Sequence, residues 1–169
     1  EAEGLRIHHL DVGGGLGITY TDETPPHAGD LVARLLEHID SRGHSHRELL
    51  FEPGRSLVGN AGVLVTEVLV LKPGEQKSFC IVDAAMNDLL RPALYDAYMG
   101  IVPCTLRDGD APLWDVVGPV CESGDWLGRD RRLAVRAGDH LAVLSAGAYA
   151  MSMASNYNRV PRPAVILSG

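Results

Sequence analysis

The chain has 169 residues, of which 46% are hydrophobic and 22% are charged, and its formal net charge is −7 at pH 7. These values are typical of a globular protein with a substantial core and exclude a disordered chain. The acidic balance, without a lysine- or arginine-rich face, argues against a nucleic-acid or membrane partner, and no apolar run approaches the roughly 20 residues of a membrane span.

The first part of the chain alternates strand and helix signals. Residues 5–12 read as a strand that runs into Gly13 to Gly15, and residues 49–51 read as another short strand. Between them, apolar residues recur at helical spacing: Leu31, Val32, Leu35, Leu36 and Ile39. This βαβ order predicts a parallel sheet.

From about Gly62 onward the pattern changes to short apolar strands separated by turn residues such as Pro73-Gly74. The predicted strands are residues 63–71, 79–82, 114–120, 133–135 and 141–145. Short helices are expected near residues 88–98 and 149–154, and residues 129–132 (RDRR) are expected to form a solvated turn. We therefore predict a second, mostly antiparallel β domain.

Glycines follow the first predicted strand, and a charged turn follows the second. Gly13 to Gly15 allow close backbone approach and can point N–H groups at an anion, although a plain flexible turn explains them equally well. Residues 52–55 (EPGR) combine a carboxylate, a rigid bend and a cation at the end of a strand, where barrel enzymes keep their chemistry. A surface turn closed by a Glu–Arg pair is the alternative.

A third candidate is the loop at residues 118–125 (GPVCESGD), which sets the Cys121 thiol beside the Glu122 carboxylate. Polar neighbours indicate a reactive loop rather than a buried structural cysteine, and an ordinary polar turn with an incidental thiol is the alternative. The chain has three cysteines, and Cys80, Cys104 and Cys121 are far apart. They form neither a disulfide framework nor a CxxC metal site, so we expect a reducing, cytoplasmic compartment.

Five motifs follow one another along nearly the whole chain: residues 11–17 (DVGGGLG), 52–55 (EPGR), 87–95 (NDLLRPALY), 118–125 (GPVCESGD) and 147–157 (GAYAMSMASNY). Together they resemble the diaminopimelate decarboxylase family, whose enzymes use pyridoxal 5′-phosphate. The resemblance implies an α/β plus β fold. Residues 1–61 would hold the last βα units of a TIM-like barrel that binds the cofactor. Residues 62–169 would form the C-terminal β domain, which carries substrate-binding and dimer-site loops.

The resemblance also implies roles for single residues. Glu52 would face the pyridine nitrogen and keep it protonated, which lets the ring accept electrons when carbon dioxide leaves. The phosphate would be held by backbone N–H groups and one guanidinium group, with Tyr149 in contact with both phosphate and substrate. The implied cofactor-binding residues are Gly14, Gly15, Glu52, Pro53, Gly54, Arg55 and Tyr149.

For the substrate, the resemblance implies that Arg91 and Tyr95 grip the distal carboxylate and that Glu122 binds the distal ammonium group. Cys121 would be the acid that returns a proton to the reacting carbon. The implied substrate-binding residues are Arg55, Arg91, Tyr95, Glu122 and Tyr149. In this family the Cys-Glu loop reaches the active site of the neighbouring subunit, so a homodimer with shared sites is implied.

The implied reaction is decarboxylation of meso-2,6-diaminopimelate to L-lysine, the final step of lysine biosynthesis. Related decarboxylases that act on ornithine or arginine have aspartate after the cysteine, so Glu122 together with Arg91 favours diaminopimelate. A related decarboxylase of a basic amino acid or of carboxynorspermidine is the alternative enzyme. A non-catalytic regulatory homologue is the alternative of a different class.

The family needs a lysine that bonds covalently to the cofactor, and the chain has only Lys72 and Lys77, which flank a turn in the β-rich part. We read both as solvated turn residues. Because the chain begins at Glu1 rather than at a methionine, we expect the missing lysine and the early barrel strands upstream, and we expect these 169 residues alone to be inactive. His8 and His9 would point to opposite faces of a strand, and His44 and His46 lack a nearby carboxylate or thiol partner, so no metal site is predicted.

Overall fold

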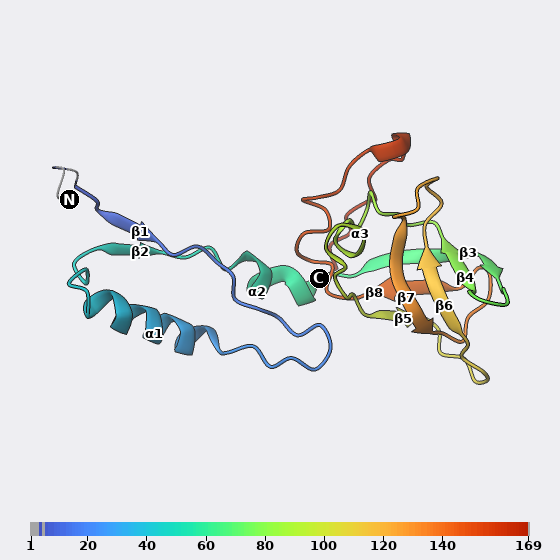
Figure 1. Ribbon diagram of the computed structural model, residues 1–169, viewed down its shortest axis with the longest axis horizontal. Coiled ribbons are helices and arrows are strands. Elements are labelled where there is room, and N and C mark those ends of the chain that lie inside the picture. The colour runs from blue at the N-terminus through green and yellow to red at the C-terminus, as the bar shows by residue number, and fades with distance from the viewer. Residues whose placement is uncertain (1–3, 5, 169) are drawn as a thin grey trace.

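The computed structural model describes residues 4 and 6–168 of the chain, which form a slender N-terminal part and a larger sheet-rich part (Figure 1). The first elements in chain order are β1 (His9–Asp11), α1 (Ala28–Asp40), β2 (Glu48–Leu50), α2 (Gly54–Val58) and the 3-10 helix η1 (Gly59–Ala61). β1 and β2 pair in parallel, with α1 between them in sequence. The predicted βαβ order is therefore confirmed. The first strand is shorter than predicted, and Leu5 lies outside the described residues.

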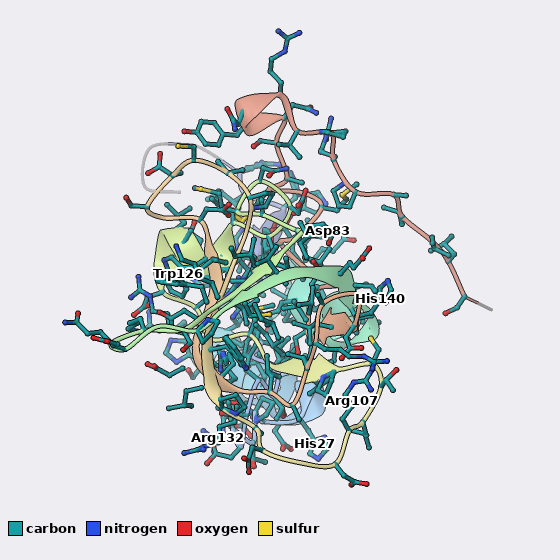
Figure 2. The ribbon with its side chains drawn as sticks, turned by 90° about the vertical axis from the view of Figure 1, so that its right-hand side faces the viewer. His27, Asp83, Arg107, Trp126, Arg132 and His140 are labelled. Atoms are coloured by element: carbon teal, nitrogen blue, oxygen red, sulfur yellow. The ribbon has the colours of Figure 1, made fainter. Side chains whose placement is uncertain are left out.

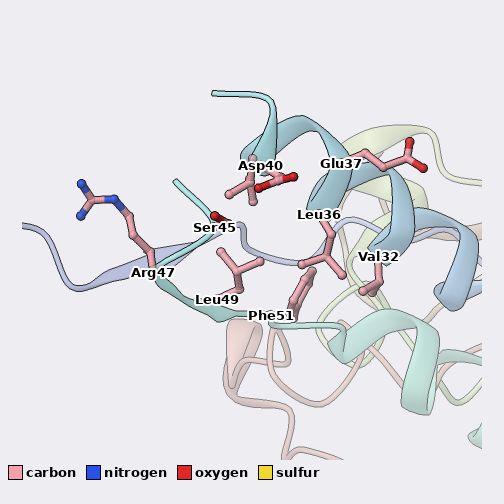
Figure 3. Close-up of a pocket in the computed structure, with 9 residues that line it drawn as sticks. Val32, Leu36, Glu37, Asp40, Ser45, Arg47, Leu49 and Phe51 are labelled. Atoms are coloured by element: carbon pink, nitrogen blue, oxygen red, sulfur yellow. The ribbon is translucent and has the colours of Figure 1, made fainter. Parts of the chain in front are cut away.

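Helix α1 forms where apolar residues recur at helical spacing, and it ends in a turn at Gly43, whose φ of 78° favours glycine. None of the described residues of α1 is buried, and Leu36 is 48% exposed. A hollow of about 580 Å³ lies between α1 and β2 (Figure 3). Its apolar lining includes Val32, Leu36, Leu49 and Phe51. The apolar face of α1 is therefore open in the described part of the chain.

The larger part is built on a six-stranded sheet with the order β5-β8-β3-β4-β6-β7. β4 and β6 pair in parallel, whereas the other neighbouring strands pair antiparallel. The prediction of a mostly antiparallel β region is therefore confirmed for the described residues. The strands are β3 (Leu64–Lys72), β4 (Phe79–Val82), β5 (Ile101–Pro103), β6 (Leu113–Val117), β7 (Trp126–Arg132) and β8 (His140–Val143), accompanied by α3 (Arg91–Tyr95) and the 3-10 helix η2 (Tyr157–Arg159).

The core lies inside this sheet because alternate strand residues point inward. In β4, for example, Cys80 and Val82 are fully buried, whereas their neighbours are half-buried. The two outer strands approach each other, since a Cβ placed on Gly128 of β7 would lie 2.8 Å from Ile101 Cδ1 of β5. A glycine at that position lets the sheet curl into a nearly closed, barrel-like shape.

Several predicted elements are wrong in detail. Residues 129–132, predicted as a turn, belong to β7. The Arg129 and Arg131 guanidinium groups pack on the rings of Trp126 and Tyr98, with 4.0 and 3.9 Å from guanidinium carbon to ring centroid. Arginines can therefore occupy strand positions when their guanidinium groups stack on aromatic rings.

Residues 133–135, predicted as a strand, form a loop after β7. The apolar pattern that led to the prediction is explained by Leu133, whose side chain is buried in the core. Residues 149–154, predicted as a helix, form turns, and Tyr149 has a φ of 61°, which no α-helix contains. The helix expected within residues 88–98 is the short α3. β5 has three residues and was not predicted, because so short a strand carries no periodic signal.

After η2 the chain runs away from the body as an extended segment, seen at the right of Figure 2. Its apolar residues are strongly exposed, with Ile166 at 88% and Leu167 at 92%. None of the helices in the described part of the chain has the length and apolar character needed to cross a bilayer.

Candidate functional site

The glycine loop after β1 lies against the turn after β2. Because the strands are parallel, their carboxyl ends lie at the same edge of the small sheet. The Asp11 carboxylate accepts a hydrogen bond from the Gly13 N–H at 2.8 Å, and the Gly13 carbonyl accepts one from the Glu52 N–H at 2.8 Å. A Cβ on Gly14 would collide with the Glu52 carbonyl oxygen. The close backbone approach predicted for this loop is therefore present, and it is directed at the charged turn.

That charged turn leads directly into α2. Pro53 precedes the helix, the Pro53 carbonyl accepts the Ser56 hydroxyl at 2.9 Å, and Gly54 and Arg55 form the first helical positions. The Glu52 side chain is exposed and Arg55 is half-buried. Among residues 4 and 6–168 no ion pair joins Glu52 to Arg55. The alternative of a surface turn closed by a Glu–Arg pair is therefore wrong, and neither charge is neutralised by the other within the turn.

Arg55 and Arg91 meet at the ring of Tyr149. The guanidinium carbon of Arg55 lies 5.9 Å from the ring centroid, and that of Arg91 lies 5.5 Å from it. Both Nε atoms are buried and have no hydrogen-bond partner among the described residues. Two cations with unused donors beside one phenol ring form a site for anionic groups, because an anion would offset the cost of burying an unpaired cationic donor.

Tyr20 also contacts Arg91 and was missed by the sequence analysis. Its ring centroid lies 5.8 Å from the Arg91 guanidinium carbon, and the side chain packs against the core of the larger sheet. The turn that holds it is fixed by Glu23, whose carboxylate accepts the N–H groups of Thr21 at 2.7 Å and Tyr20 at 2.9 Å. These backbone donors, Thr21 first, lower the pKa of Glu23 to about 2. Glu23 therefore orders the loop that places Tyr20 beside Arg91.

Glycines at the junction between the two parts bring Tyr149 to Arg55. The Gly147 N–H donates to the Gly59 carbonyl at 3.0 Å, and the Ala146 N–H donates to the Gly62 carbonyl at 2.8 Å. A Cβ on Gly147 would collide with the Val58 carbonyl oxygen of α2. The chain after β8 can lie this close to α2 only because position 147 has no side chain.

Helix α3 presents Arg91 and Tyr95 at its two ends, as predicted for a single helical turn. Arg91 is half-buried and turns towards Tyr149, whereas Tyr95 is 61% exposed. Asp96 ends the helix in the left-handed conformation, with φ of 52°. The two side chains therefore share one helix but have different surroundings within the described part of the chain.

The loop that carries Cys121 and Glu122 is exposed at its tip and fixed at its base by Asp125. The Asp125 carboxylate is 4% exposed and accepts the N–H groups of Met86 and Val120, both at 2.7 Å. Burial raises the pKa of Asp125, and the nearby charge of Glu122 adds to this effect. Asp125 therefore holds the loop against the segment that leads to α3.

Glu122 has a partner that the sequence did not reveal. The Tyr157 hydroxyl donates a hydrogen bond to Glu122 Oε2 at 3.3 Å. This hydrogen bond raises the pKa of Tyr157, with the Glu122 charge as a further cause, so the phenol stays protonated at neutral pH. Tyr157 is the last residue of the motif at residues 147–157, and this position was the only indication in the sequence that it belongs to the site. Spacing alone could not have paired it with Glu122, because the contact is tertiary.

The predicted residues thus form separate groups within this chain. Gly14 lies against the Glu52 turn, and Arg55 and Arg91 both lie close to the Tyr149 ring. In the described part of the chain, no hydrogen bond, ion pair or ring contact joins Cys121 or Glu122 to these groups. Glu122 instead lines a small hollow together with Leu90 and Tyr157.

The lysines lie away from both groups. Lys77 is not merely solvated, as predicted, because its Nζ lies 2.8 Å from Asp115 Oδ2 and 3.7 Å from Asp130 Oδ1. The hydrogen bond to Asp115 raises the pKa of Lys77. Lys77 thus links the turn after β3 to β6 and β7, while Lys72 is exposed. Within the described residues, no group of three or more His, Cys, Asp or Glu side chains could hold a metal ion.

Comparison with known proteins shows which family the chain is similar to. Over 167 residues the chain is 54% identical to diaminopimelate decarboxylase of Vibrio cholerae, a match that covers 99% of this chain and 40% of that protein. It is likewise 54% identical over 165 residues to diaminopimelate decarboxylase of Pseudomonas aeruginosa, covering 98% of this chain and 39% of that protein. The chain spans about 40% of the length of the curated relatives that it matches.

Solved structures give the same result. The crystal structure of diaminopimelate decarboxylase from M. jannaschii matches with a TM-score of 0.86 and 40% identity, over 96% of this chain and 38% of that one. The Helicobacter pylori enzyme complexed with L-lysine matches with a TM-score of 0.84 and 41% identity, over 95% of this chain and 39% of that one. Residues 17–147 match the family described as pyridoxal-dependent decarboxylase, C-terminal sheet domain. The chain therefore belongs to the pyridoxal-dependent decarboxylases and contains their C-terminal sheet domain.

Proposed function

We propose that this chain is part of a diaminopimelate decarboxylase, which converts meso-2,6-diaminopimelate to L-lysine and carbon dioxide in the final step of lysine biosynthesis. The observation that carries the proposal is that Arg55 and Arg91 both lie close to the Tyr149 ring, at 5.9 and 5.5 Å from its centroid, so that two cations are available for two anionic groups. A cofactor phosphate and a substrate carboxylate are the anions that this reaction brings. Identity of about half the residues to enzymes of that name supports the proposal.

The residues around Glu52 fit pyridoxal 5′-phosphate. Gly14 lies so close to the Glu52 carbonyl that only glycine is accommodated, and the Arg55 Nε is buried without a partner among the described residues. We propose that Gly14, Gly15, Gly54 and Arg55 hold the phosphate, with Pro53 shaping the turn and Tyr149 adding its hydroxyl. When bound, the cofactor supplies an electron-accepting ring for the bonding pair that carbon dioxide leaves behind. Glu52 would keep the ring nitrogen protonated.

The remaining predicted residues are proposed to bind different groups of the substrate. We propose that Arg91 and Tyr95, on the same helical turn, bind the distal carboxylate, and that Glu122 binds the distal ammonium group. Arg55 and Tyr149 would face the reacting end. A substrate with both a carboxylate and an ammonium group at its distal end matches this pair of charges, whereas ornithine offers only a cation there.

Cys121 is proposed to return the proton. Its thiol is exposed at the tip of a loop whose base is fixed by Asp125, so a proton donor is presented from a supported position. Since no contact within the described chain joins this loop to the Arg55–Arg91 group, we propose that it completes the site of a neighbouring subunit in a homodimer. The separation of the groups supports that assembly.

We also propose that residues 1–61 are the last βα units of a TIM-like barrel and that residues 62–169 are the C-terminal β domain. The open apolar face of α1 supports this division, because further barrel elements would cover it (Figure 3). The lysine that bonds to the cofactor would come from outside these residues, since Lys77 is paired with Asp115 in the larger sheet. We expect the 169 residues alone to be inactive, and we propose a cytoplasmic location for the protein.

The test is carbon dioxide release by the full-length protein with pyridoxal phosphate, from meso-diaminopimelate, ornithine and carboxynorspermidine in parallel. Release from diaminopimelate with L-lysine as product is the expected result. Release from one of the others would retain the cofactor site but overturn the roles of Arg91 and Glu122. No release from any of them would favour a non-catalytic homologue.

A further inference from the structure

The side chain of Glu122 is held from a second segment of the same chain. Its backbone is fixed locally, because the Glu122 N–H donates to the Val120 carbonyl at 2.8 Å and the Asp125 N–H donates to the Glu122 carbonyl at 3.0 Å. These bonds orient the backbone but leave the carboxylate free to rotate. The Tyr157 hydroxyl, 3.3 Å from Oε2, is the contact that orients the carboxylate.

Tyr157 is itself held in place by Asn87. The Ser155 N–H donates to the Asn87 carbonyl at 2.9 Å, and the Tyr157 N–H lies 3.3 Å from the Ser155 hydroxyl oxygen. Asn87 is 1% exposed, so this connection starts in the core and reaches the surface at η2. In Figure 1, η2 lies at the same end of the sheet as the loop between β6 and β7. A surface tyrosine with such support has less freedom than its exposure suggests.

A small hollow of about 210 Å³ lies between these groups. It is lined by Met86, Asn87, Leu90, Glu122, Ser155 and Tyr157. Tyr157 occupies one oxygen of the carboxylate, Oε2, which leaves the other oxygen of Glu122 to accept from a ligand. The geometry therefore leaves one hydrogen-bonding face of Glu122 for an ammonium group.

We propose that Tyr157 is a specificity-determining residue that positions Glu122 for the distal ammonium group of the substrate. The inference rests on the proposed function, in which Glu122 binds that group. Because the Tyr157 hydroxyl donates to Glu122 Oε2, the residue would act through Glu122 as a positioning residue. Because Tyr157 and Glu122 belong to one chain, the pair stays together whichever subunit's site the loop completes.

The test compares two substrates that differ only in that ammonium group: meso-diaminopimelate and 2-aminopimelate. In the full-length protein, Tyr157→Phe removes the hydroxyl and keeps the ring. The expected result is a fall in kcat/KM for diaminopimelate of roughly three- to tenfold, the usual range for one lost hydrogen bond, with no change for 2-aminopimelate. In a Glu122→Gln background the same substitution is expected to have little further effect.

Tyr98→Phe is the matched control. Tyr98 is 49% exposed, close to the 50% of Tyr157, and its ring packs on Arg131 of β7 away from Glu122. It should leave both substrates unaffected. Equal losses for both substrates with Tyr157→Phe would mean a merely structural role, and no loss for either would mean that Glu122 needs no such support. Either result overturns the inference.

A second measurement does not depend on turnover. Carbon-13 NMR of labelled tyrosines follows the ionisation of the Tyr157 phenol, and Glu122→Gln is expected to shift its titration to lower pH because the carboxylate partner is lost. An unchanged titration would show that the contact is absent in solution and would overturn the inference. A wild-type protein inactive on both substrates would instead refute the proposed function, and the NMR result would still report whether Tyr157 holds Glu122.

Discussion

Replacing Asp125 by alanine is expected to loosen the loop that carries Cys121 and Glu122. The Asp125 carboxylate is 4% exposed and accepts two backbone N–H groups at 2.7 Å, from Met86 and Val120. In the alanine variant both donors lose their acceptor inside the protein. A buried donor without a partner costs about 1–3 kcal/mol.

The expected change in the free energy of loop opening is the cost of two such donors, minus the gain from no longer burying a charged carboxylate. Burial raises the pKa of Asp125, which indicates that the charged carboxylate is held at some expense to stability. We therefore expect local opening of the loop to become easier by about 3 kcal/mol, on the order of 100-fold. Asp125→Asn keeps one acceptor oxygen but turns an amide N–H₂ towards the other donor. It is expected to have about half that effect.

The assay is amide hydrogen exchange in the full-length protein, followed at Val120 and Met86. Ser123→Ala is the control, because Ser123 is exposed in the same loop and makes none of the bonds that fix its base. Protection at both amides should fall in the order wild type, Asp125→Asn, Asp125→Ala. Unchanged protection in the alanine variant would refute the reasoning. A loss of the same size in the Ser123 control would show that the loop is loosened by any change, without a special role for the carboxylate.

Three further outcomes are expected. Gly147→Ala should lower the melting temperature and weaken the binding of pyridoxal phosphate, which is measured by its absorbance. The reason is that the added Cβ collides with the Val58 carbonyl of α2 and displaces the segment that carries Tyr149. An unchanged spectrum and an unchanged melting temperature would contradict this. Arg107 donates to Asp139 at 2.8 Å and holds the pKa of that carboxyl well below its ordinary value, so the pair stabilises the fold at neutral pH and this contribution is lost as the pH falls below the ordinary aspartate pKa. Arg107→Met should therefore lower the melting temperature most at pH 7 and progressively less below pH 4, and a pH-independent difference would be inconsistent with that cause. Burial raises the pKa of Cys80 to about 11, so iodoacetamide at pH 8 should modify the exposed Cys121 and spare Cys80 until the protein unfolds, as mass spectrometry of the digested protein can show.

Strand positions in the larger sheet were predictable where burial alternates. Residues 79–82 were predicted as a strand, and β4 has those bounds, because alternate residues enter the core. β7 was not predictable in the same way. Its charged residues predict a solvated turn. Arg129 and Arg131 fit into the strand because they stack on the rings of Trp126 and of Tyr98, which comes from a distant segment. Hydrophobic periodicity cannot identify a strand in which arginines stacked on aromatic rings take the place of apolar residues.

The candidate site, too, could be predicted from the sequence only in part. The meeting of Gly14 with the Glu52 turn follows from parallel strands, whose carboxyl ends share one edge. The meeting of Arg55 and Arg91 at Tyr149 does not follow from spacing. It depends on a positive φ at Tyr149 and on glycines that allow the chain after β8 to lie on α2. Motif order identified these residues as a set, but only tertiary packing places them around one ring.

The two groups of candidate residues differ in how they are supported, and this has a consequence for assembly. The Cys121–Glu122 loop is fixed to a packed sheet through Asp125 and is oriented by Tyr157, so its geometry is complete within this chain. Arg55 lies in α2, none of whose described residues is buried, and α2 belongs to the same N-terminal part as the open apolar face of α1. We therefore expect the setting of Arg55 to depend on elements that would cover α1. Ordering the covering elements should therefore change protection around α2 and leave the acidic loop as it is.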